Sequence, residues 1–63
     1  MIILTRLNSS KFILNCDLIE SIEETPDTVI TLTNGKITIV AERAEQVVEK
    51  IMEYKRSLYS GMR

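Results

Sequence analysis

The segment from Asp17 to Lys36, DLIESIEETPDTVITLTNGK, predicts two strands that are each ended by a turn. The Pro26-Asp27 pair ends the first strand, because proline presets φ for a turn and aspartate hydrogen-bonds its own backbone. The Asn34-Gly35 pair ends the second and predicts a type I′ hairpin turn, which needs a positive φ at both residues. Residues 28–33 (TVITLT) between the two turns are almost all β-formers. The segment therefore predicts an antiparallel β-meander.

Runs of apolar and β-branched residues on both sides extend this meander. The predicted strands lie at about 1–7, 11–14, 18–25, 28–32 and 36–40, with small polar residues in most of the connections. In the first of them Ile2 and Leu4 share one face and Ile3 lies on the other, because side chains alternate along a strand. We expect a small antiparallel β-meander of about five strands over residues 1–40, for which a half-open barrel is one arrangement.

From residue 42 onward the apolar period changes from two to 3.6 residues, which predicts an amphipathic helix over about 42–58. Acidic residues in its first turns and basic residues in its last match the helix dipole. Neither Ala41 nor Glu42 is a favoured capping residue, so the start is left open between 41 and 44. The chain is thus predicted to be a single α+β domain over 1–63. The residues that follow the helical period are Ala44, Val47, Val48, Ile51, Tyr54, Lys55 and Leu58.

A chain of 63 residues can build only a marginal core. Disulfides, a metal or oligomerisation usually compensate in such small domains. The sequence has one cysteine, Cys16, and no histidine, which argues against an internal disulfide and a zinc-type site. Several predicted strands are apolar on both faces, whereas one helix can cover only one face. Either the sheet closes into a barrel or its second apolar face meets another protein. Because the small core has neither a disulfide nor a metal site to stabilise it, we expect contacts with a partner protein, and a homo-oligomer in particular.

No catalytic, cofactor or metal site is expected from the residue types. Histidine, the commonest general base, is absent. Cys16 has no neighbouring base and is interpreted as a packing residue. Glu23 and Glu24 are adjacent on a predicted strand, so their carboxylates point to opposite faces and cannot share a site.

The charge pattern indicates neither nucleic acid nor membrane as a partner. Eight basic and nine acidic residues give a net charge of -1, without the basic excess typical of a nucleic-acid binder. The chain has no run of 18 apolar residues, so membrane insertion is not expected. The start, MIILTRL, lacks the basic region of a secretory signal, and an unpaired cysteine suits a reducing compartment. We expect a cytoplasmic location.

Several short motifs occur in a fixed order along the chain: TRLN (5–8), FILN (12–15), DLIE (17–20), TPDTVI (25–30), TNGK (33–36) and VVEKI (47–51). In this order and spacing the chain resembles the small flagellar FlbD family, which includes SwrD-like swarming-motility proteins, over roughly positions 1–56. Two turn positions depart from the family pattern. Ser9 stands where the family usually has glycine, and Cys16 stands where it usually has proline.

The resemblance implies a non-catalytic accessory protein of the flagellum that supports motility, helping the motor, its stators or flagellar assembly. It does not supply a molecular mechanism. From the residues alone, a small regulatory nucleic-acid-binding β-barrel module stays as the alternative. A purely structural subunit of a larger ring would have the same sequence features as the accessory protein.

Polar residues at turns and strand ends form the candidate interaction site, because a rigid scaffold presents recognition groups there. Turn chemistry alone can explain Asp27 and Asn34. Arg6 and Glu20 are not needed for a turn and are the stronger candidates. The full set is Arg6, Asn8, Glu20, Glu23, Asp27 and Asn34.

Overall fold

The computed structural model describes residues 1–61, with side chains as far as Leu58. It confirms the predicted α+β class, with five strands followed by one helix. The first strand is shorter than predicted, and the helix begins later than residue 42 and continues past residue 58. The elements are β1 (Ile2–Thr5), β2 (Lys11–Leu14), the 3₁₀ helix η1 (Cys16–Leu18), β3 (Ile19–Glu24), β4 (Thr28–Leu32), β5 (Ile37–Val40) and α1 (Ala44–Gly61).

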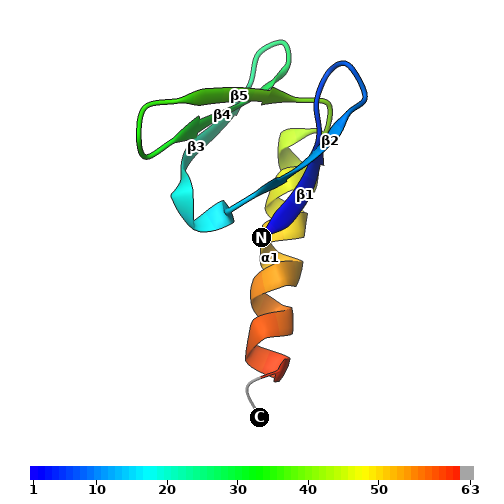
Figure 1. Cartoon of the computed structure of the whole chain (residues 1–63), viewed down its shortest axis with the longest axis vertical. Coiled ribbons are helices and arrows are strands. Elements are labelled where there is room, and N and C mark those ends of the chain that lie inside the picture. Colours follow the sequence, from blue (N-terminus) through cyan, green and yellow to red (C-terminus); the bar gives the residue numbers. More distant parts are fainter. Residues whose placement is uncertain (62–63) are drawn as a thin grey trace.

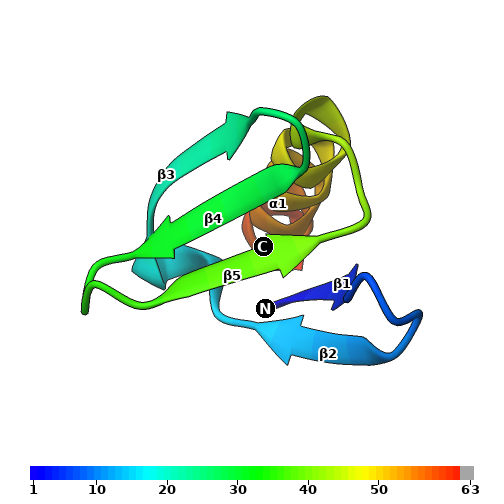
Figure 2. The ribbon, with the colours of Figure 1, turned by 90° about the horizontal axis from the view of Figure 1, so that it is seen from above.

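The strands form two antiparallel sheets rather than one (Figure 2). Strands β1 and β2 make a hairpin in which Ile3 lies opposite Ile13. The other sheet has the order β3-β4-β5. An isolated antiparallel bridge between Arg6 and Val40 joins β5 to the residue that follows β1. Over residues 1–61 the β layer is curled but does not close into a barrel.

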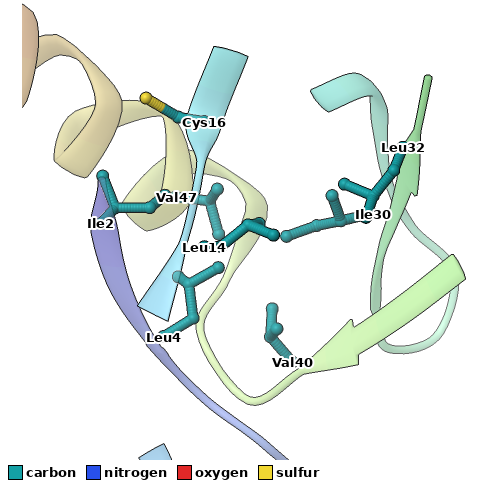
Figure 3. Close-up of a cluster of buried hydrophobic side chains, with 8 residues drawn as sticks. All are labelled: Ile2, Leu4, Leu14, Cys16, Ile30, Leu32, Val40 and Val47. Carbon is teal, nitrogen blue, oxygen red and sulfur yellow. The ribbon is translucent and has the colours of Figure 1, made fainter. Parts of the chain in front are cut away.

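The core lies between this β layer and the first half of α1 (Figure 1). Leu4, Ile30, Val40 and Val47 come from four different elements and are fully buried there (Figure 3). The predicted alternation in β1 is confirmed, because Ile2 and Leu4 are buried while Ile3 is exposed. The complete buried cluster is Ile2, Leu4, Leu14, Cys16, Ile30, Leu32, Val40 and Val47.

The turn between β4 and β5 lies where it was predicted, but its type is different. Gly35 N–H donates to the Leu32 carbonyl at 2.9 Å, and Leu32 N–H donates to the Lys36 carbonyl at 2.8 Å. Gly35 has φ +87°, whereas Asn34 is not among the residues with positive φ. This pattern is a type I turn followed by a left-handed residue, not type I′. The Asn34 side chain supports it by accepting a hydrogen bond from Lys36 N–H at 2.9 Å.

The turn between β1 and β2 repeats this arrangement. Ser9 N–H donates to the Arg6 carbonyl at 2.9 Å, and Arg6 N–H donates to the Ser10 carbonyl at 2.8 Å. The Asn8 side chain accepts from Ser10 N–H at 3.0 Å. Ser9, at φ +76°, therefore occupies the left-handed position that Gly35 holds in the other hairpin.

Replacing Ser9 with glycine is expected to raise the free energy of unfolding by about 0.5–1 kcal/mol. A left-handed conformation costs a residue with a Cβ roughly 1–2 kcal/mol, and the greater freedom of glycine in the unfolded chain offsets part of that gain. Urea unfolding measures the change. The reverse variant, Gly35→Ser, is the matched control and should lower stability by a similar amount. A destabilised Ser9→Gly variant would contradict this account of the turn.

Candidate interaction surface

The six predicted interaction residues are all exposed, but they do not form one cluster. Asn8 and Asp27 lie in the β1–β2 and β3–β4 turns, at the end of the β layer where α1 begins (Figure 2). Asn34 lies in the β4–β5 turn at the opposite end. Glu20 and Glu23 lie on β3.

Local backbone geometry accounts for three of these residues. The Asn8 and Asn34 side chains each accept a hydrogen bond from the backbone N–H two residues on, which is how asparagine stabilises a turn. The carbonyl of Asp27 accepts from Thr25 N–H at 3.2 Å, in a turn that contains a cis Thr25–Pro26 peptide. These three positions hold the turns themselves.

Arg6 has a structural role that the sequence did not indicate. Its backbone forms the bridge to Val40, and its guanidinium carbon lies 4.2 Å from the centroid of the Phe12 ring. This cation–π contact covers one face of the ring. Tyr54 is half-buried against the core. One face of the Phe12 ring is therefore covered, and Tyr54 is partly withdrawn from solvent.

Glu20 lies at an irregularity in β3. Ile19 pairs with Leu32 and Ser21 pairs with Thr31, so Glu20 is the extra residue of a β-bulge. Bulges and charged side chains both discourage unwanted pairing along an exposed sheet edge. Glu20 is therefore an exposed charged residue at a bulge in the edge strand of this sheet.

The outer face of the three-stranded sheet carries apolar side chains. Across it, Glu23 lies opposite Val29, which lies opposite Ile39. Two residues further along β4, on the same face, Thr31 lies opposite Ile37. The Ile37 side chain is 64% exposed, and Ile39 is 43% exposed. We call Val29, Thr31, Ile37 and Ile39 the outer strip; it is bordered by the carboxylate of Glu23.

Glu42 and Thr5 form a polar contact that sequence reasoning missed. The Glu42 carboxylate accepts from Thr5 N–H at 2.9 Å and from the Thr5 hydroxyl at 2.8 Å. Burial raises the pKa of this carboxyl, but the two hydrogen bonds from Thr5, the backbone N–H of Glu42 and the charge of Lys50 together outweigh it, so the pKa lies below its usual value. The contact ties the end of β1 to the segment that enters α1.

The N-terminus of α1 is capped partly by a residue from β3. Arg43 is the residue before the helix, and its N–H donates to the Gln46 side chain at 2.8 Å, as in half of a capping box. Glu24 accepts from Ala44 N–H at 2.8 Å and lies 3.6 Å from the Arg43 guanidinium. This distant carboxylate explains how the helix starts without a favoured capping residue of its own.

The described residues offer little that could perform catalysis. Over 1–61 no group of three or more His, Cys, Asp or Glu side chains is placed to hold a metal ion. Cys16 is a free thiol buried in the core. An open groove between β1 and α1 is lined by both apolar and charged side chains. Within residues 1–61 no helix is long and apolar enough to span a membrane. The groove residues are Met1, Ile2, Ile3, Lys50, Glu53, Tyr54 and Ser57.

Comparison with known proteins identifies one family. The family model FlbD, described as flagellar and swarming motility proteins, matches residues 1–59. The match covers all five strands and most of α1. Neither a curated protein nor a solved structure matches the chain.

Proposed function

This chain belongs to the FlbD family of flagellar and swarming motility proteins, and from that premise we propose that it acts by protein–protein contact. It supports motility without catalysis, as a cytoplasmic accessory protein at the base of the flagellum. Its partner is a component of the motor or its stators. The observation that carries this proposal is the exposed outer strip.

The outer strip suits a protein partner because both of its isoleucines are exposed. Ile37 and Ile39 stand on the same side of β5, and Val29 on β4 continues the apolar surface. An apolar patch with a polar rim is typical of a protein interaction site. Glu23 lies on this rim and supplies a charge that a basic partner residue would pair with.

Arg6 and Glu20 are proposed as secondary polar contacts. Both are exposed, and the roles that the structure gives them, covering Phe12 and occupying a bulge, leave their charged groups accessible. Asn8, Asp27 and Asn34 contribute to the proposed site only by holding the turns in which they lie.

Replacing Ile37 with threonine is expected to reduce swarming toward that of a strain lacking the protein. Threonine keeps the β-branched shape that suits a strand but removes apolar contact area. The measurement is the rate of swarm expansion after complementation of the deletion strain. Ile13→Thr is the matched control, because Ile13 is 68% exposed on the outer side of the β1–β2 hairpin, beyond the outer strip.

Full swarming by a folded Ile37→Thr protein would remove the outer strip from the partner interface. Circular dichroism of the purified variants shows whether both keep the fold. Equal loss of swarming in both variants would indicate a general effect of surface polarity and would also contradict the proposal.

A further inference from the structure

The second half of helix α1 extends away from the sheet (Figure 1). Leu58 lies on the same stripe of the helix as the fully buried Val47 but is 49% exposed, and Met52, on the opposite side of the helix, is 57% exposed. Most of the stability of a helix in a protein comes from packing of its apolar face. The outer turns of α1 therefore have apolar surface that the described part of the chain leaves uncovered.

One exposed face of α1 has a graded charge. Glu45, Glu49, Met52 and Arg56 follow the spacing i, i+4, i+7, i+11, so they line one face, and all four are exposed. Val48, 44% exposed, borders this face. The acidic residues lie on the side of Met52 toward the start of the helix, and the basic residue lies on the other side.

We propose that two copies of the chain pair through this face, with their α1 helices antiparallel and a two-fold axis near Met52. In this arrangement Met52 packs near the partner's Met52, and Glu49 lies close to the partner's Arg56. By symmetry Arg56 lies close to the partner's Glu49, so both ion pairs form.

The charge gradient selects the antiparallel orientation. A parallel pair would place Glu49 beside the partner's Glu49 and Arg56 beside the partner's Arg56, which is repulsive. A contact between two short helical segments buries little surface, so we expect a dissociation constant on the order of micromolar. The pairing does not depend on the proposed role at the motor, because it buries the helix face and leaves the outer strip free.

Sedimentation of the purified full chain over a range of concentrations tests the pairing. The wild type is expected to form dimers, and Glu49→Lys and Arg56→Glu are each expected to weaken them at least about tenfold, since each variant places two like-charge contacts in the interface. An equimolar mixture of the two variants should recover dimers, because each copy then supplies the charge that the other lacks.

The double variant Glu49→Lys/Arg56→Glu is again self-complementary and should dimerise like the wild type. Dimerisation of the double variant, together with circular dichroism spectra of the single variants, shows whether a single variant has lost the dimer contact or has lost its fold. A wild type that stays monomeric at the highest concentration would overturn the proposal. So would single variants that dimerise normally, or a mixture that fails to recover dimers. Swarming is not the readout here, so this test and that of the outer strip can fail separately.

Discussion

Truncation of Leu4 to alanine is expected to remove most of the free energy of unfolding. Leu4 is fully buried at the centre of the cluster that joins β1, the three-stranded sheet and α1. Replacing a buried leucine with alanine costs about 2–5 kcal/mol, because transfer free energy is lost and a cavity remains. A core of this size supplies a net stability of only about 3–5 kcal/mol. Urea unfolding followed by circular dichroism measures the loss.

The neighbouring residue gives the control for this prediction. Ile3 is 55% exposed on the opposite face of β1, so Ile3→Ala should cost less than about 1 kcal/mol. The contrast between adjacent residues tests the register of β1 directly. Equal losses from the two substitutions would mean that β1 does not present Leu4 to the core.

Replacing Glu42 with glutamine is expected to lower the free energy of unfolding by about 1–2 kcal/mol near neutral pH. The carboxylate accepts two hydrogen bonds from Thr5, and a neutral amide accepts them more weakly. The contact is only partly buried, so solvent screening keeps the loss at the lower end of the range for charged hydrogen bonds.

The effect should depend on pH with a definite sign. Because the pKa of Glu42 is lower in the folded protein than in the unfolded chain, its ionised form stabilises the fold above the unfolded pKa. That contribution disappears as the pH falls through the folded pKa. Unfolding curves of wild type and Glu42→Gln should therefore converge in acid. Glu23→Gln, on the exposed side of β3, is the control that should leave the free energy of unfolding near neutral pH almost unchanged. A constant gap between wild type and Glu42→Gln would contradict the assignment.

Strong local signals in the sequence predicted most of the fold. Runs of β-forming and apolar residues between turn signals located all five strands, and the 3.6 period located α1. The predicted turn type after β4 was wrong, because Asn34-Gly35 is compatible with more than one kind of hairpin loop. The hydrogen bonds that involve Leu32 and Lys36 determine which loop forms. The start of α1 was uncertain for another reason: a carboxylate twenty residues away, Glu24, helps to cap it. Gln46 was the one local signal that could have located the cap.

The candidate site was harder to predict than the fold. Polar turn residues suggested recognition, yet Asn8 and Asn34 use their side chains to hold the turns. The outer strip could be anticipated only in part, as a strand that is apolar on both faces. Which apolar face stays exposed depends on where α1 packs, and the pairing of Glu42 with Thr5 depends on how the chain folds back on β1.

The most direct test of the account is to delete the gene in a flagellated host and measure filament number and motor torque in the same cells. A protein that acts by contact with the motor or its stators predicts normal filaments that turn with reduced torque, and complementation should restore the torque. Missing filaments would place the protein in assembly or gene expression. Unchanged torque with normal filaments would contradict a role in motility altogether.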